Sequence, residues 1–219
     1  MKERPILFST QMVRAILRGV KTQTRRVIPV LPKRGYSLHQ ISEDKFCFRK
    51  VHKNGDATHS DVFRRPFDPC DLLWVRETYR PIFGQTGDLI GVDYKADPPE
   101  EWERLGDVVG TPVKWRPSIH MPRQISRLLL KVTSIRAEPL KEISDEDAIR
   151  EGIYKSICIS KRCPFYIGEC WDGNERLLAT GVPRLDFETL WRGLYPEGKK
   201  SWGANPWVWV IDFDVVKRP

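Results

Sequence analysis

The segment Gly19–Arg26 has the residue types best suited to chemistry, because it places three cations and two threonine hydroxyls within eight positions. The cations are Lys21, Arg25 and Arg26. Residues 1–34 hold nine basic side chains against one acidic side chain, so this stretch carries the whole formal net charge of +8. A cationic segment on an otherwise balanced chain predicts an anionic partner, with nucleic acid or a nucleotide first and an anionic membrane surface second.

Aromatic and basic side chains suited to nucleic acid recur further along the chain. Trp115 and Trp202 lie in polar, turn-prone contexts beside Arg116 and Lys200, and exposed rings of this kind stack on flipped or single-stranded bases. Contacts with the nucleic acid are also expected from Thr22, Arg25, Arg26, Arg76 and Arg116. For each of these residues the alternative is an ordinary place in the core or on a solvated surface.

Composition excludes several classes of protein. Hydrophobic residues make up 40% of the 219 residues and include eight Trp, so the chain can bury a core. No apolar run approaches the roughly 18–20 residues of a membrane span, and we expect a cytoplasmic protein without a membrane partner. A zinc site formed by Cys158, Cys163 and Cys170 is the weaker alternative to free thiols, because no C-x-x-C pair is present. We therefore expect neither a metal nor a cofactor.

Hydrophobic periodicity predicts the elements that position these residues. Strands are expected at Pro5–Ser9, Leu72–Thr78, Leu89–Lys95, Ser126–Leu140 and Trp207–Val216, with a hairpin about Asn54-Gly55. Helices are expected at Gln11–Arg18, Ser144–Gly152 and Leu185–Tyr195, the last with a buried stripe of Leu185, Leu190, Trp191 and Leu194. The pattern predicts an α+β fold, a small mixed β-barrel with a few short peripheral helices. We expect one domain over 1–219, with insertions at about 31–69 and 153–183.

The segment Ile16–Arg26 resembles the N-terminal motif of the ASCH superfamily, G-x-K-T-x-T followed by basic residues. Three later segments agree in order with that family: Asp71–Arg76, with Cys70 in the usual Gly position, Ile143–Gly152 and Trp207–Phe213. Two further segments, Lys114–Pro122 and Ser201–Trp207, are similar to the longer uncharacterised ASCH proteins of phages and prophages. The resemblance covers about half the chain and implies a PUA-like β-barrel whose cleft holds RNA, a nucleotide or a modified base.

One branch of the ASCH superfamily is a small amidohydrolase acting on N4-acetylcytidine through a Lys, a Thr and a Glu. Carried over to this chain, these residues are Lys21, Thr24 and Glu151, with Glu77 as a competing acid. A threonine nucleophile needs a base, and a lysine serves as that base only when it is neutral, a state favoured by burial or neighbouring cations. A regular strand would direct Lys21 and Thr24 to opposite faces, so they converge only if the chain turns after Gly19.

The leading prediction is binding of RNA, DNA or a modified nucleoside in a basic cleft around Lys21–Arg26. Three alternatives stay open: amidohydrolysis of an N4-acylated cytidine, metal-independent cleavage of RNA by the same basic cluster, and a non-catalytic protein-interaction module. The sequence does not decide whether the protein is an enzyme, since the same cleft can bind without cutting. If it is an enzyme, we expect a hydrolase.

Overall fold

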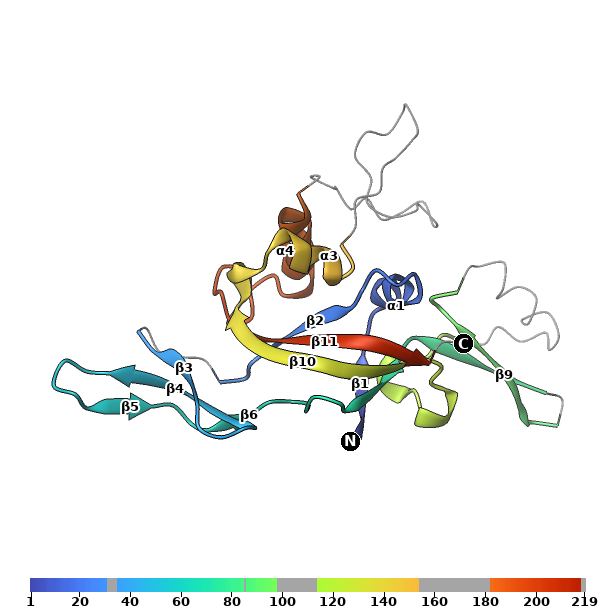
Figure 1. Cartoon of the computed structure of the whole chain (residues 1–219). Coiled ribbons are helices and arrows are strands. Elements are labelled where there is room, and N and C mark those ends of the chain that lie inside the picture. Colours follow the sequence, from blue (N-terminus) through green and yellow to red (C-terminus); the bar gives the residue numbers. More distant parts are fainter. Residues whose placement is uncertain (31–34, 85, 98–113, 154–181, 218–219) are drawn as a thin grey trace, which may run out of the picture. The chain divides into compact units, whose positions relative to one another are not determined.

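Mixed strands and short helices make up the computed structural model, which describes residues 1–30, 35–84, 86–97, 114–153 and 182–217 (Figure 1). The strands are β1 Glu3–Leu7, β2 Gln23–Val27, β3 Ser37–Gln40, β4 Lys45–Val51, β5 Ala57–His59, β6 Phe63–Arg64, β7 Leu72–Arg76, β8 Tyr79–Phe83, β9 Leu89–Tyr94, β10 Leu129–Pro139 and β11 Trp207–Lys217. The helices are α1 Thr10–Leu17, α3 Asp145–Arg150 and α4 Pro183–Leu194, with single 3-10 turns at Ser118–His120, Arg123–Ile125 and Leu140–Glu142. The expected α+β class is confirmed.

The chain divides into two compact units, each assembled from separated stretches of sequence. The first unit comprises Met1–Thr22, Cys70–Val132 and Phe213–Pro219, and the second comprises Gln23–Pro69 and Thr133–Asp212. In the first unit β1 pairs in parallel with β7, and β10 pairs antiparallel with β7. In the second unit β2 pairs antiparallel with β11, which also neighbours β10. The described strands form open sheets, and a closed barrel is not seen among them.

The core of the first unit follows the predicted alternation of β7. Leu73 and Val75 are buried, whereas Trp74 and Arg76 on the other face are partly exposed. The apolar side of α1 adds further buried side chains, namely Val13, Ala15 and Ile16. Ser9 caps this helix, since its side chain accepts a hydrogen bond from the Met12 N–H at 3.4 Å. Gly19 follows the helix with a φ of +77°, a conformation that favours glycine at a helix end.

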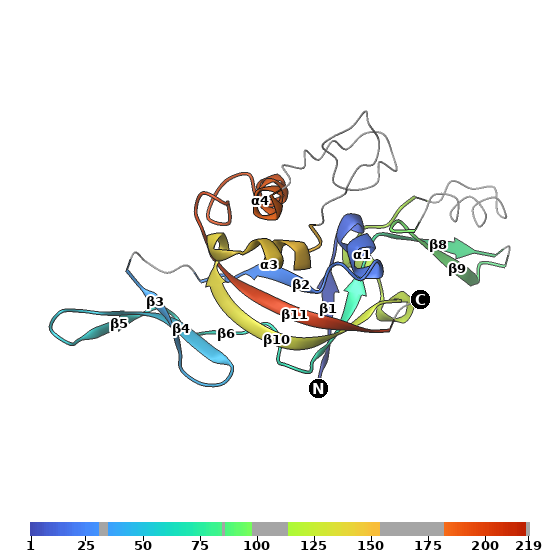
Figure 2. The same cartoon turned by 45° about the horizontal axis from the view of Figure 1, so that its top comes forward.

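In the second unit α3 and α4 lie side by side, as both ribbon views show (Figures 1 and 2). Apolar side chains of α3, α4 and β11 share one cluster with residues of the adjoining turns: Leu140, Ile143, Ala148, Phe187, Trp191, Trp202, Val208 and Val210. The stripe expected on α4 is only partly right. Trp191 is buried, but Leu185 and Leu194 are 46% and 50% exposed. Phe187 is buried instead, on the same face as Trp191 because it lies four residues before it.

Part of the expected first insertion forms a small sheet of its own, with β4 between β3 and β5. β4 and β5 form the predicted hairpin, and Gly55 in its turn has a φ of +90°. β6 pairs with the start of β4. One face of this sheet packs against two tryptophans of β11, with Phe46 4.9 Å from Trp209 and Phe48 5.4 Å from Trp207 between ring centroids.

Several sequence predictions fall on residues that the structure does not describe. Most of the expected second insertion lies at 154–181, outside the described residues, and Cys158, Cys163 and Cys170 lie there too. In the described ranges, no group of three or more His, Cys, Asp or Glu side chains is arranged to hold a metal ion. None of the helices in those ranges is both long enough and apolar enough to cross a bilayer.

The aromatic packing of β4 predicts a large loss of stability when Phe48 is truncated. Phe48→Ala removes a fully buried ring, and we expect the free energy of unfolding to fall by about 3–5 kcal/mol. Val51→Ala, at an exposed position on the same strand, should change it by less than about 0.5 kcal/mol. Urea denaturation followed by tryptophan fluorescence measures both. Equal losses in the two variants would contradict this packing.

Candidate functional site

Lys21 lies in the turn between α1 and β2 and is completely buried. Its backbone N–H donates to the Ala15 carbonyl at 3.1 Å, which folds the chain back onto the end of α1. The Nζ atom lies 5.6 Å from the centroid of the Phe8 ring. Lys21 therefore precedes the strand, and the alternation expected of a regular strand does not govern its direction.

Strand alternation separates the other motif side chains. Gln23 and Arg25 share one face of β2, and Thr24 lies on the other; all three are buried. Across the pair with β11, Gln23 lies opposite Asp212 and Thr24 lies opposite Ile211. The polar side chains that contact β2 therefore lie on the face that carries Gln23 and Arg25.

The guanidinium of Arg25 is buried and joins three carboxylates. Its Nη2 lies 2.7 Å from Oε1 of Glu138 and 3.0 Å from Oδ2 of Asp147. Its Nη1 lies 3.2 Å from Oε1 of Glu151 and donates to Oε1 of Gln23 at 2.7 Å. Arg25 thus ties β2 to β10 and to α3 through charge-assisted hydrogen bonds.

Asp212 joins this network from β11. Its Oδ1 accepts from Nε2 of Gln23 at 2.8 Å, and its Oδ2 accepts from the Ser134 hydroxyl at 2.5 Å. The same Gln23 Nε2 also donates to Asp147 at 3.1 Å. The Gln23 amide is therefore held at both ends, with its oxygen toward Arg25 and its nitrogen toward two carboxylates.

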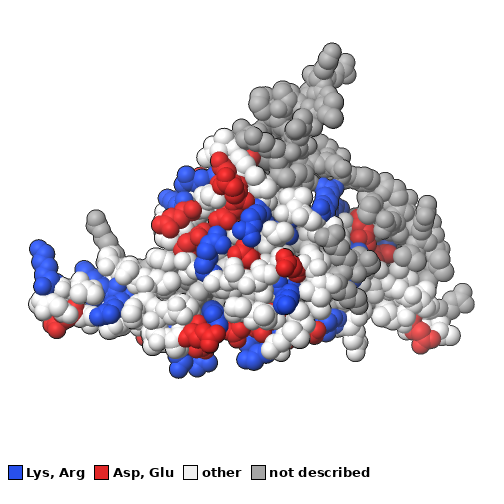
Figure 3. All heavy atoms as spheres, viewed as in Figure 1, with Lys and Arg blue, Asp and Glu red and all other residues white. Residues whose placement is uncertain are grey.

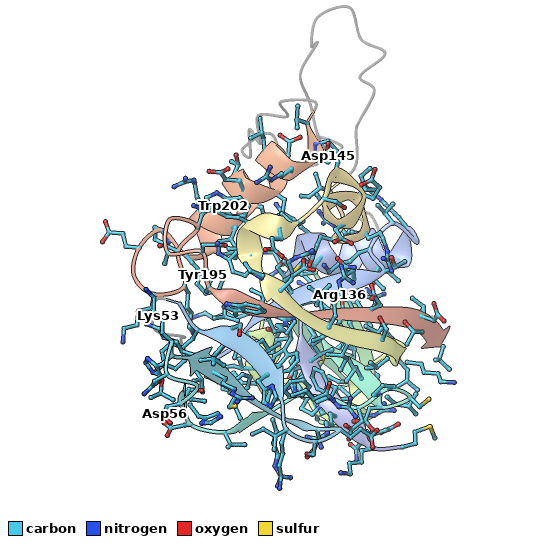
Figure 4. The ribbon with its side chains drawn as sticks, turned by 60° about the vertical axis from the view of Figure 1, so that its left-hand side comes forward. Lys53, Asp56, Arg136, Asp145, Tyr195 and Trp202 are labelled. Carbon is cyan, nitrogen blue, oxygen red and sulfur yellow. The ribbon has the colours of Figure 1, made fainter. Side chains whose placement is uncertain are left out.

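Two partly exposed arginines bond the outer carboxylates of the network. Arg136 on β10 (Figure 4) donates to Asp147 at 2.8 Å and to Glu138 at 3.1 Å. Arg150, at the end of α3, donates to Asp212 at 2.7 Å. Their side chains are 40% and 45% exposed, unlike that of Arg25. They lie at the rim of the network.

The short helix α3 positions two of the carboxylates. Ser144 caps it, because its hydroxyl accepts from the Asp147 N–H at 3.1 Å. Glu151 is the residue that ends the helix, and its N–H donates to the Asp147 carbonyl at 2.9 Å. Asp145 (Figure 4) accepts from the Arg184 N–H at 3.0 Å, which fixes the start of α3 against α4.

Asp147 and Arg26, both in the second unit, have perturbed pKa values. Burial would raise the pKa of Asp147, but the Gln23 hydrogen bond and the charges of Arg136 and Arg25 outweigh it and leave the pKa below its usual value. Burial lowers the pKa of the Arg26 guanidinium, against the opposing charge of Glu151. Arg26 nevertheless stays protonated near neutral pH.

The competing acid Glu77 lies in the first unit, in a different environment. Arg127 donates hydrogen bonds to both carboxylate oxygens of Glu77, from Nε at 2.9 Å and from Nη2 at 3.1 Å. Arg127 also bonds Asp97 at 2.6 Å and lies 4.0 Å from the centre of the Tyr94 ring. Burial raises the pKa of Glu77 and outweighs the pull of Arg127. Glu77 thus belongs to an ion-pair cluster with Arg127 and Asp97 in the first unit.

The catalytic set expected from the resemblance is distributed over both units. Lys21 belongs to the first unit, whereas Thr24 and Glu151 belong to the second. Within the second unit, the motif side chain of Arg25 donates to Glu151 at 3.2 Å, and Thr24 lies on the opposite face of β2 from Arg25. Convergence of Lys21, Thr24 and Glu151 stays a prediction.

Two of the expected nucleic-acid contacts are internal. Trp202 (Figure 4) is only 5% exposed. It packs edge-on to Phe187, with 6.3 Å between ring centroids, and its stacking on a base stays a prediction. The polar residues next to Trp202 in the sequence had suggested an exposed ring, whereas the ring packs against α4. Arg25 was expected at a phosphate, and its side chain is buried among carboxylates; its contact with a phosphate stays a prediction.

The remaining expected contacts are more accessible. Arg76 donates to the backbone carbonyls of Met121 and Ile119, and Arg116 is exposed. Trp115 is half-buried, and the guanidinium of Arg80 lies 5.2 Å from its ring centroid. Thr22 is half-buried, and its carbonyl accepts from the Phe213 N–H at 2.9 Å. Their contacts with nucleic acid, like those of the partly buried Arg26, stay predictions.

Sequence reasoning missed most of the network that the structure assembles around Arg25. The missed residues are Gln23, Ser134, Arg136, Glu138, Asp147, Arg150 and Asp212. One signal was present: Ser134, Arg136 and Glu138 alternate along β10, and Asp212 and Asp214 along β11, so each strand presents several polar side chains on one face.

No family model, curated protein or solved structure matches the chain. The likeness to the ASCH superfamily rests on the motif residues of the chain itself.

The lowered pKa of Asp147 predicts a loss of stability in acid. A carboxylate whose pKa is lower in the folded than in the unfolded state stabilises the fold above the unfolded value, and this contribution is lost as pH falls through the folded value. The free energy of unfolding should therefore decrease as pH falls below about 5, and by less in Asp147→Asn. Glu146→Gln, on the exposed side of α3, should keep the wild-type slope. Identical slopes for wild type and Asp147→Asn in urea titrations would contradict this assignment.

Proposed function

We propose that this chain is an ASCH-like protein with a PUA-like barrel that binds a modified nucleoside beside the Gly19–Arg26 motif. The observation that carries the proposal is the burial of the motif side chains. Lys21, Gln23, Thr24 and Arg25 are all buried, whereas a merely solvated basic strand would expose its cations. Buried ionisable groups in such density are typical of binding and catalytic sites.

A structural role alone accounts poorly for the network around Arg25. Apolar residues of similar volume stabilise a fold as well as a buried ion pair does, or better, because both charges of the pair lose their hydration. In addition, the buried Nε–H of Arg25 has no acceptor among the described residues. An oxygen of a bound ligand would satisfy this donor. We therefore interpret the network as part of a recognition site.

The chemistry of the network favours a neutral base over a phosphate. Carboxylates such as Glu151 and Asp212 accept from an exocyclic amine, and the buried Nε–H of Arg25 would donate to a ring carbonyl or nitrogen, which together match a cytosine-like edge. Four carboxylates face the three bonded guanidinium groups. No excess of positive charge remains there to attract a phosphate. On the face shown in Figure 3, basic and acidic side chains are likewise interspersed around the sheet of β10 and β11.

Hydrolysis of an N4-acylated cytidine is the second candidate, and the burial of Lys21 favours it. A lysine acts as a general base only when it is neutral, and removal from water favours that form. The position of Thr24 argues against hydrolysis. Thr24 and Arg25 lie on opposite faces of β2, and Glu151 is bonded to Arg25. Binding therefore comes first and cleavage second.

The binding proposal predicts that N4-acetylcytidine or cytidine binds more tightly than cytidine 5′-monophosphate. Isothermal titration calorimetry measures each affinity directly. Glu151→Gln should weaken nucleoside binding at least about tenfold, since a hydrogen bond to a charged group contributes about 1.5–3 kcal/mol. Glu146→Gln removes an exposed charge one turn earlier on α3 and should leave affinity unchanged. No heat with either nucleoside, or tighter binding of the monophosphate, would overturn the proposal.

Hydrolysis predicts conversion of N4-acetylcytidine to cytidine by the purified protein, followed by liquid chromatography. Lys21→Met keeps the length and volume of the side chain but removes the amine, so product formation should fall to background. Lys131→Met, at an exposed position, should retain full turnover. Bound nucleoside without product at high protein concentration would leave binding as the function and exclude cleavage.

A further inference from the structure

The small sheet of β3, β4, β5 and β6 has two faces of opposite chemistry. Cross-strand partners share a face, so the register places Lys45 with Arg64 and Arg49 with His59. His39 lies opposite Cys47 on the same face, two residues from each of these positions along β4. This face, defined by Lys45, Arg49, Arg64, His39 and His59, is called the basic face below.

The other face of the sheet is fixed by the aromatic core. Phe46 and Phe63 lie opposite each other in the register, and both approach Trp209, at 4.9 and 6.2 Å between centroids. Phe48 packs on Trp207. A slip by one residue would expose all of these rings, so the orientation of the sheet is strongly specified. The basic face cannot exchange places with the aromatic face.

Every charged side chain at the paired positions of the basic face is a cation. Arg64 and His59 are exposed, as is His39. One acidic residue lies at the edge: Asp44, 3.4 Å from Arg64, with both side chains well exposed. An exposed pair of this kind contributes only about 0–1 kcal/mol. A competing anion can therefore replace Asp44 at little cost.

Arg49 adds an independent sign of a missing partner. Its Nε atom is buried and has no hydrogen-bond acceptor among the described residues. A buried donor without an acceptor is costly, and a guanidinium binds phosphate oxygens through two parallel hydrogen bonds. A phosphate at the basic face would satisfy this donor.

The dimensions of the basic face favour a chain of phosphates over a single one. Lys45 and Arg49 are four residues apart on β4, which separates their Cα atoms by about 13 Å. A membrane surface is a poorer match, because membrane-binding surfaces anchor themselves with exposed aromatic and aliphatic side chains. The aromatic rings of this sheet are instead packed on its other face.

We propose that the basic face binds the sugar-phosphate backbone of a nucleic-acid strand, with Lys45, Arg49 and Arg64 as the phosphate contacts. This surface is separate from the network around Arg25 and uses none of its residues. The proposal does not depend on nucleoside binding. It also gives the chain a polyanion contact outside the N-terminal segment in which the net charge is concentrated.

The test is fluorescence anisotropy with a labelled uridine oligonucleotide and its single-stranded DNA counterpart over a series of salt concentrations. The variant Lys45→Gln/Arg49→Gln/Arg64→Gln should bind at least about tenfold more weakly, and the slope of log affinity against log salt should fall by about 2–3. The control Lys2→Gln/Lys131→Gln/Lys199→Gln removes three exposed cations elsewhere and should keep most of the affinity. Thermal melting verifies that both variants fold, and Arg49→Gln alone provides a milder test.

Binding of either oligonucleotide with this dependence supports the proposal, and the preferred one identifies the sugar. Equal losses in the two triple variants would overturn it, since net charge alone would then explain binding. It would also be overturned if neither oligonucleotide binds, or if only vesicles containing phosphatidylserine do. None of these outcomes bears on the calorimetry with nucleosides.

Discussion

The second unit depends on the ion pairs between the buried guanidinium of Arg25 and three carboxylates. This guanidinium is the point where β2, β10 and α3 meet, through Glu138, Asp147 and Glu151. Removing one partner of a buried charge pair costs about 3–5 kcal/mol, because the other charges are left without compensation. The placement of α3, and with it of Glu151, therefore follows from an electrostatic requirement at one residue of the motif.

Because of these ion pairs, part of the positive charge in residues 1–34 is not on a surface that could bind a polyanion. The sequence concentrates its entire excess of cations in residues 1–34, which suggests a surface for polyanions. In the structure Lys21 and Arg25 are buried, and Arg25 is neutralised by carboxylates that come from distant parts of the chain. Polyanion binding fits the basic face of the small sheet better, where Lys45, Arg49 and Arg64 lie outside that segment.

Local patterns in the sequence predicted most elements but not the network that joins them. The helices α1 and α3, the strand β7 and the hairpin at Gly55 depend on neighbouring residues, and the structure contains all of them. Burial of Arg25 and Trp202 depends on partners more than a hundred residues away or on the packing of α4, so composition near either residue was misleading. A polar side chain looks exposed in sequence until its distant partners are known.

The most direct test of this account is a double-mutant cycle between Arg25 and Glu151. Unfolding free energies of wild type, Arg25→Met, Glu151→Gln and the double variant give the coupling between the two side chains. A buried, hydrogen-bonded pair predicts a coupling of at least about 1.5 kcal/mol. Additive effects within about 0.5 kcal/mol would contradict the account, since Arg25 would then not hold Glu151 in place.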